Sequence, residues 1–151
     1  MRRFLALLAV TLAFTSSVSI ADETEDVDNA VAAARAWLSI VDAGKFGESW
    51  DRSATTFQKG IAKANWEQAV GNVRVPIGAL RSRILMKGAE APKLVKLAAG
   101  HAVVIQFTSA FEKLAPAIET VTPFREQDGS WRVSGYYIKP VPPPAGAAPP
   151  G

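Results

Sequence analysis

The sequence of 151 residues contains no cysteine and only one histidine. The absence of cysteine excludes a disulfide, a thiolate metal site, a cysteine nucleophile and a lipid-modified N-terminal cysteine. A single histidine excludes a histidine-rich metal site and argues against a serine–histidine–aspartate triad. Without disulfides, the stability of the folded chain must come from an apolar core, and the length allows one such core.

The first 21 residues have the layout of a secretory signal peptide. A basic start at Met1–Arg3 precedes the 11-residue run Phe4–Phe14, in which one residue is polar, and the small residues of Ser19–Ala21 come just before Asp22. A membrane-spanning helix needs about 20 apolar residues, so this run is too short, and the polar and acidic residues after it argue against an anchor or a buried helix. The context of the arginine pair favours Sec-type export, to the periplasm or beyond, over the twin-arginine route.

Removal of residues 1–21 changes the charge of the chain. It takes away Arg2 and Arg3 but no acidic residue, which leaves 15 basic and 14 acidic residues. A net charge of +1 gives no electrostatic argument for binding nucleic acid or an acidic membrane. We therefore expect no nucleic-acid partner, and no membrane span after cleavage.

The segment from Pro140 to Gly151 reads PVPPPAGAAPPG and holds six of the ten prolines. Proline fixes φ and removes amide donors, so neither a helix nor a sheet can continue through it. We expect an unstructured, polyproline-like tail, with a spacer or a ligand for a proline-binding groove as alternatives. The folded domain is therefore expected within residues 22–139.

Helical periodicity covers the first half of this domain. Apolar residues recur at three- and four-residue spacing from Val27 to Val41, acidic residues crowd the start of this stretch, and Gly44 follows it. A second helix is predicted over Phe46–Ile61 and a third over about Asn65–Val73, after which Pro76 and Gly78 break the pattern.

The second half has the alternation of strands. Strands are predicted over Ala79–Met86, His101–Phe111, Ile118–Arg125 and Trp131–Lys139, and the turn at Gln127–Ser130 joins the last two as a hairpin. Helices followed by antiparallel strands predict an α+β domain. We expect three N-terminal helices packed on a curved antiparallel sheet of about four strands, with the concave face of the sheet on the first helix.

Several short motifs together resemble one family of exported bacterial proteins. They are VDAGKFGESW at Val41–Trp50, RVPIG at Arg74–Gly78, ETVTPF at Glu119–Phe124 and DGSWRVSGYYIK at Asp128–Lys139. The chain thereby resembles domain of unknown function 4019 over roughly residues 28–139, with a longer and more basic link at Pro92–Gly100. The order of elements is also similar to that of the nuclear-transport-factor-2-like (NTF2-like), or cystatin-like, superfamily, which implies a cone-shaped fold. The family resemblance implies a secreted protein and brings no catalytic residues.

Charged residues near the predicted helix–sheet junction form the first candidate site. Asp42 lies at a helix end, where the dipole disfavours a carboxylate, so we expect it to bond Ser49, Arg74 or a backbone amide. Glu119 lies in an otherwise apolar strand and is expected to pair with an arginine across strands. Such a pair is favoured over the alternative, in which Arg83 or Arg81 binds a carboxylate or phosphate from outside the chain.

Aromatic residues form the second candidate. Tyr136 and Tyr137 are adjacent, so they point to opposite sheet faces, and strict alternation places Tyr137 with Trp131 and Val133. Such aromatics would stack a sugar or another flat ligand, although most aromatics belong to a core. His101, at the start of a strand, is either polar surface or an acid–base group.

These candidates support three functions. The favoured one is a non-catalytic periplasmic domain that binds a small ligand or a partner protein, with Arg74, Arg83, Glu119, Trp131 and Tyr137 as its binding residues. The second is an enzyme of isomerase or hydratase type, in which Asp42, His101 or a tyrosine converge on one cavity as acid and base. The third is a structural domain that forms a homodimer through the outer sheet face. We expect no metal and no cofactor in any of them.

Overall fold

The computed structural model describes residues 20–87, 92–97 and 100–142. The helices are α1 (Ile20–Asp42), α2 (Phe46–Asp51), α3 (Thr55–Gly60) and α4 (Lys63–Ile77). The strands are β1 (Leu80–Leu85), β2 (Lys93–Leu97), β3 (Gly100–Phe111), β4 (Ala117–Arg125) and β5 (Trp131–Pro140). Most of the predicted signal peptide (residues 1–19) and of the predicted tail (residues 143–151) lies outside the described residues.

The strands form one open antiparallel sheet, which confirms the predicted α+β class. Its order is β1-β3-β4-β5, and β2 pairs with β3 on the same side as β1. β1 pairs with the second half of β3 and β2 with its first half, so two short strands share one long neighbour. β3 and β4 therefore lie at the centre of the sheet, and each has a neighbouring strand on both sides.

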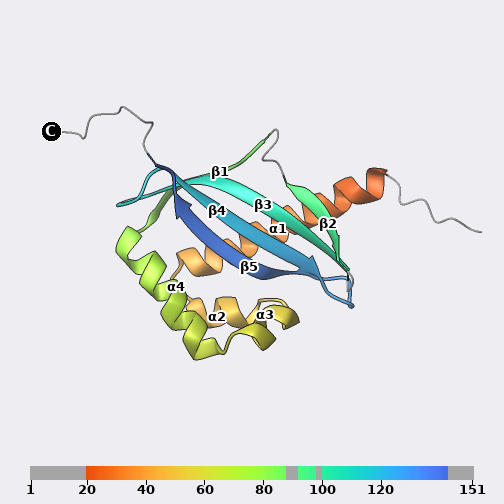
Figure 1. Cartoon of the computed structure of the whole chain (residues 1–151), viewed down its shortest axis with the longest axis horizontal. Coiled ribbons are helices and arrows are strands. Elements are labelled where there is room, and N and C mark those ends of the chain that lie inside the picture. Colours follow the sequence, from red (N-terminus) through yellow and green to blue (C-terminus); the bar gives the residue numbers. More distant parts are fainter. Residues whose placement is uncertain (1–19, 88–91, 98–99, 143–151) are drawn as a thin grey trace, which may run out of the picture.

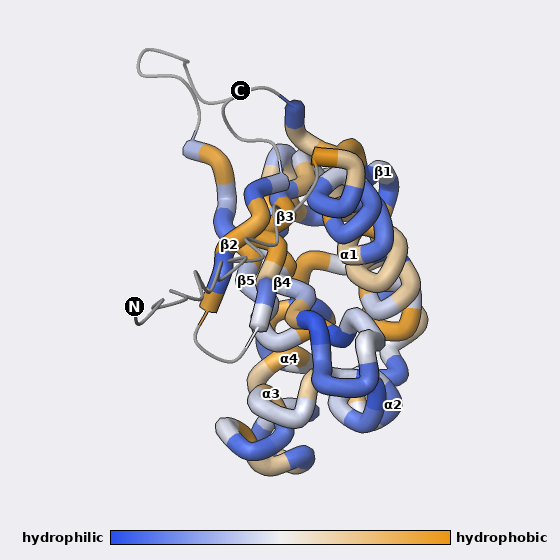
Figure 2. The backbone as a smooth tube through the Cα atoms, turned by 90° about the vertical axis from the view of Figure 1, so that its right-hand side faces the viewer, coloured by the Kyte–Doolittle hydropathy of each residue, from blue (hydrophilic) through white to orange (hydrophobic). Residues whose placement is uncertain are grey.

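The helices lie on one side of the sheet (Figure 1). α1 runs across the inner face and packs on β3, β4 and β5, while α2 and α4 pack on each other beside the C-terminal half of α1. Apolar residues recur along α1 and concentrate in β3 (Figure 2). None of the described helices is both long enough and apolar enough to span a bilayer.

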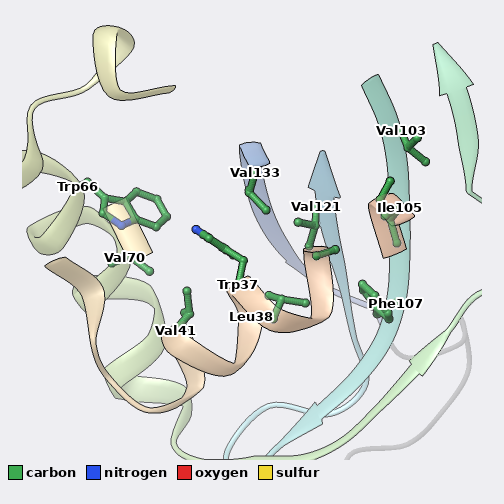
Figure 3. Close-up of a cluster of buried hydrophobic side chains, with 12 residues drawn as sticks. Trp37, Leu38, Val41, Trp66, Val70, Val103, Ile105, Phe107, Val121 and Val133 are labelled. Carbon is green, nitrogen blue, oxygen red and sulfur yellow. The ribbon is translucent and has the colours of Figure 1, made fainter. Parts of the chain in front are cut away.

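The core forms where α1 meets both the sheet and α4. Trp37, Leu38 and Val41 of α1 lie between Trp66 and Val70 of α4 on one side and the inward residues of the sheet on the other (Figure 3). The sheet contributes Val103, Ile105, Phe107, Val121 and Val133, all at most 1% exposed. This core confirms the predicted inward face of the first helix and the alternation predicted for the strand at residues 101–111.

The buried tryptophans are structural, because their indole nitrogens are satisfied inside the core. Trp37 Nε1 donates to the Ser49 carbonyl at 2.8 Å and to Ser53 Oγ at 3.1 Å. Trp66 Nε1 donates to Ser49 Oγ at 2.9 Å. Ser49 in α2 and Ser53 just after it thus fix this part of the chain between α1 and α4.

Three predicted element boundaries are wrong. The predicted helix over Phe46–Ile61 is interrupted, because Ala54 is extended and its amide donates to the Val133 carbonyl of β5 at 2.8 Å. The third helix continues to Ile77, with Pro76 in its last turn and Gly78, at φ 78°, as its end. The predicted link at Pro92–Gly100 contains β2, so the sheet has five strands instead of four.

A β-bulge in β5 decides which tyrosine faces the core. Thr122 pairs with Gly135 and Pro123 with Val133, so Ser134 is an extra residue in β5. Pro123 has no amide hydrogen to donate to the neighbouring strand. Prolines within sheets are therefore found at bulges, as here. Because the bulge shifts the alternation by one residue, Tyr136 joins Val133 on the inner face and Tyr137 points outward, 62% exposed. The sequence-based placement of Tyr137 beside Trp131 and Val133 is therefore wrong.

Deletion of Ser134 is expected to preserve the fold, because Val133 and Tyr136 then face inward through regular alternation. We expect a loss of about 1 kcal/mol in the free energy of unfolding, from the hydrogen bond that Ser134 Oγ donates to the Thr122 carbonyl. An alanine inserted between Gly135 and Tyr136 turns Tyr136 outward and should cost roughly 3 kcal/mol or more. Urea denaturation of both variants tests this, and equal destabilisation would contradict the assignment of the bulge.

Candidate functional site

A polar cluster lies inside the domain between the end of α1 and the sheet. Its members come from six different elements: Asp42 of α1, Arg74 of α4, Arg83 of β1, Ser109 of β3, Glu119 of β4 and Tyr136 of β5. We call these six residues the charge cluster. It contains two carboxylates and two guanidinium groups, so its formal charge is zero with both hydroxyls neutral.

Glu119 is the centre of the charge cluster. Its side chain is fully buried and accepts five hydrogen bonds. Oε1 accepts from Arg74 at 3.1 Å, Arg83 at 3.1 Å and the Tyr136 hydroxyl at 2.7 Å. Oε2 accepts from Arg83 Nε at 2.6 Å and Ser109 Oγ at 2.5 Å. A buried carboxylate requires such saturation, because an unpaired charge in a low-dielectric interior costs several kcal/mol.

Arg83 joins the two carboxylates of the charge cluster. One edge of its guanidinium binds Glu119 through Nε and Nη2, and the other binds Asp42 through Nη1 at 2.6 Å and Nη2 at 3.0 Å. This double bidentate geometry uses the planar fork that distinguishes arginine from lysine. The donor groups of Arg83 are therefore occupied by carboxylates of its own chain. This does not support the alternative in which Arg83 binds an anion from outside the chain.

Arg74 completes the charge cluster from the helical side. It donates to Asp42 Oδ1 at 2.6 Å and to Glu119, and its guanidinium lies over the ring of Phe111 at 4.6 Å. The expected bond from Asp42 to Arg74 and the expected arginine–glutamate pair are both confirmed. Arg81, the other arginine considered, lies outside the charge cluster and pairs with Glu112 at the surface.

The pKa values of Asp42 and Tyr136 are held away from neutrality. Burial raises the pKa of Asp42, but the hydrogen bonds and charges of Arg83 and Arg74 outweigh burial and hold it below the usual 3.8. Burial, and then the charge of Glu119, raise the pKa of Tyr136 well above its ordinary value of 10. Asp42 therefore stays ionised and Tyr136 stays neutral near pH 7. A general acid or base needs a pKa close to the working pH, so neither residue has the pKa of such a group.

His101 lies far from this cluster, near the first half of α1. Its Nδ1 is 4.0 Å from Asp26 Oδ2, and Asp26 also pairs with Arg125 at 3.1 Å. Asp26 precedes Asp42 by 16 residues of α1, which corresponds to about 24 Å along the helix axis. The two acid–base candidates, Asp42 and His101, are therefore not brought together.

Trp131 stands between two adjoining clefts along the edge where α1 meets β5. The first, of about 710 Å³, includes Asp22, Glu25, Asp26, Asn29, His101 and Arg125 in its lining. The second, of about 500 Å³, includes Trp37, Ile40, Glu48, Arg52, Ser130 and Arg132. Ala33 and Trp131 line both, so we treat the two as one site and call it the Trp131 cleft.

The candidate binding residues thus fall into three places. Arg74, Arg83 and Glu119 are in the charge cluster, Trp131 is in the cleft that bears its name, and Tyr137 is on the outer sheet face. Sequence reasoning missed Ser109 and Tyr136, and it assigned no role to the arginines of the Trp131 cleft. The signal that could have found Tyr136 is Pro123, since a proline within a predicted central strand indicates a bulge.

Metal ligation finds no support in the part of the chain that the structure describes. There, no group of three or more histidine, cysteine, aspartate or glutamate side chains is arranged to hold an ion. The two carboxylates of the charge cluster, Asp42 and Glu119, are already paired with arginines.

Comparison with known proteins gives one match. The model of the family described as "Protein of unknown function (DUF4019)" matches residues 33–136. No curated protein and no solved structure matches the chain. The likeness of layout to the NTF2-like superfamily therefore stays a prediction, and the matched description supplies no activity.

Replacement of Arg83 by methionine is expected to destabilise the domain by about 3–5 kcal/mol, because it leaves Glu119 and Asp42 buried with too few partners. Arg81→Met, two residues earlier in the same strand, is the matched control. Its pair with Glu112 is exposed, so the loss should stay below about 1 kcal/mol. Urea denaturation measures both, and similar losses would contradict the central position of Arg83.

Proposed function

The chain belongs to the DUF4019 family, and from this premise we propose that it is an exported, non-catalytic domain that binds a small polar ligand of the saccharide class in the Trp131 cleft. The observation that carries the proposal is the position of Trp131. Its ring lines both halves of a cleft whose other walls are rich in charged and polar side chains. An indole face beside hydrogen-bonding groups suits a ring that is flat and apolar on one side and bears hydroxyl groups around its edge.

The lining of the Trp131 cleft supports a polar ligand of this kind. Carboxylates of Asp22 and Glu25 accept hydrogen bonds, the guanidinium of Arg52 donates them, and Asn29 does both. Charges of both signs are present, so the cleft does not select a strongly charged ligand. The volumes, about 710 and 500 Å³, lie in the range of about 300–1,000 Å³ that is usual for small-molecule sites.

The enzyme alternative has less support. It requires that acid and base groups converge on one cavity, whereas Asp42 and His101 lie near opposite ends of α1. Tyr136, which belongs to the same cluster as Asp42, donates a hydrogen bond from its hydroxyl group to Glu119 and is held neutral there. A binding domain therefore accounts for the described residues more directly than an isomerase or hydratase does.

Export is part of the same proposal. It rests on the signal-like sequence of residues 1–21, and a periplasmic or secreted location gives the cleft access to saccharides outside the cytoplasm. Cleavage after Ala21 would remove the first two residues of α1 and leave Asp22, which lines the Trp131 cleft, as the new N-terminus.

Processing can be measured on the protein that cells export. We expect mass spectrometry of the extracytoplasmic fraction to find a chain that begins at Asp22, because Ser19 and Ala21 supply the small residues that signal peptidase requires. Ala21→Phe should accumulate the unprocessed chain in the membrane or cytoplasm. An unprocessed wild-type chain confined to the cytoplasm would contradict the export part of the proposal.

Ligand binding can be measured by thermal shift of the processed chain with neutral, amino and acidic saccharides. A ligand at about a hundredfold excess over its Kd stabilises the native state by about 2.7 kcal/mol. We expect a saturable rise in Tm that Trp131→Ala abolishes. Because Trp131 also packs on the core, Asn29→Ala, an exposed change in the cleft, serves as a second variant that should weaken the shift.

The matched control is Tyr137→Ala, which removes an exposed aromatic ring on the outer sheet face and outside the Trp131 cleft. It should leave the saccharide-dependent shift unchanged. The proposal would fail if no saccharide shifts the wild-type chain, or if the Trp131, Asn29 and Tyr137 variants all respond as the wild type does.

A further inference from the structure

A third concavity, smaller and different in chemistry, lies between α4 and β5. Its lining is Trp66, Ala69, Val70 and Val73 from the helix and Tyr136, Tyr137 and Ile138 from the strand. We call it the α4–β5 groove. None of these side chains carries a charge, in contrast to the Trp131 cleft, and two of them remain well exposed, Val73 at 42% and Tyr137 at 62%.

The size of the α4–β5 groove indicates the kind of occupant. Its volume of about 200 Å³ is below the usual range for small-molecule sites, so it suits one or two side chains of a docked segment. The stretch of α4 that forms its wall, from Trp66 to Val73, is about 10 Å long. A polyproline II segment rises about 3.1 Å per residue, so three of its residues cover that length.

Aromatic rings beside small residues are the surface that proline-rich segments recognise. Such segments place their rings against tryptophan and tyrosine and lose little entropy, because the polyproline II conformation is already formed before binding. In the α4–β5 groove, Tyr137 supplies an exposed ring and Ala69 a small side chain, whereas Trp66 also lines the groove but is only 6% exposed and belongs mainly to the core. The free edge of β5 is a weaker alternative for strand pairing, because Lys139, Pro140 and the bulge at Ser134 interrupt it.

The chain itself carries a segment of this composition next to the α4–β5 groove. Ile138 lines the groove, and the proline-rich sequence starts two residues later at Pro140. The backbone is fixed up to that point, because the Val141 amide donates to the Pro116 carbonyl at 3.0 Å. A tethered segment has an effective concentration in the millimolar range, so even a weak contact with the groove would be populated.

We propose that the α4–β5 groove is a docking site for proline-rich segments and that its occupant is the part of the chain's own proline-rich sequence that follows Pro142, residues 143–151. This proposal is independent of the Trp131 cleft, which is lined in part by α1 and shares no lining residue with the α4–β5 groove. It gives a binding role to Tyr137, which is exposed and takes no part in the core. It also gives the proline-rich sequence a contact within the chain.

The test compares the full chain with the same chain ended after Pro142, which keeps every described helix and strand. The probe is a fluorescently labelled synthetic peptide, PVPPPAGAAPPG, and a peptide with serine at each proline is its control. We expect the proline peptide to bind the shortened chain at least tenfold more tightly than the full chain, because the full chain's own segment competes for the groove. The serine peptide should bind neither.

Two variants of the shortened chain locate the binding. Val73→Asp places a carboxylate in the α4–β5 groove and should weaken peptide binding at least tenfold. Val75→Asp is the matched control, since it makes the same change two residues on in the same helix at a residue that is 71% exposed and outside the groove. It should leave binding unchanged, and circular dichroism checks that both variants fold.

Three results would overturn the proposal. The first is a shortened chain that does not bind the proline peptide. The second is equal affinity of the full and shortened chains, which would mean that the segment does not occupy its own groove. The third is a doubling of the full chain's mass in light scattering that is lost on shortening, which would assign the segment to the groove of a second copy.

Discussion

One buried carboxylate constrains the arrangement of the whole domain. Glu119 lies at the centre of the sheet with no exposed surface, and the burial of a carboxylate has a tolerable cost only if donors surround it. The donors come from α4, β1, β3 and β5, and Asp42 at the end of α1 balances the second arginine. The sheet, the long helix and the last helix must therefore reach one geometry together, since a displaced partner leaves a buried charge unpaired.

The charge cluster and the apolar core divide the inner face of the sheet between them. Toward the start of β3 the inward residues are Val103 and Ile105, which belong to the core with Trp37 and Leu38. Toward its end they are Ser109, which donates to Glu119, and Phe111, whose ring lies against Arg74. The interior is thus filled by the chain itself. The Trp131 cleft and the α4–β5 groove lie at the rims, beside α1 and α4.

Sequence patterns predicted those features that depend on strong local signals. The period of Val27–Val41 and the alternation of His101–Phe111 gave the long helix and the central strand, and lone charges in apolar settings identified Asp42 and Glu119. The patterns failed where a contact between residues far apart in the sequence determines the local structure. The break in the second helix depends on the bond from Ala54 to Val133, β2 depends on pairing with β3, and the inward tyrosine depends on a bulge opposite Pro123. Arg83's double pairing likewise requires elements far apart in sequence.

The two borders of the sheet have a consequence for solubility at high concentration. Among the described residues, one border is divided between two short strands, β1 and β2, and the other carries a bulge, Lys139 and Pro140. Neither presents a long, flat row of free amides and carbonyls, which is the template on which foreign strands assemble into aggregates. The chain has no disulfide that could restrain a partly opened state. The irregular edges of its sheet therefore provide the protection against strand pairing between molecules.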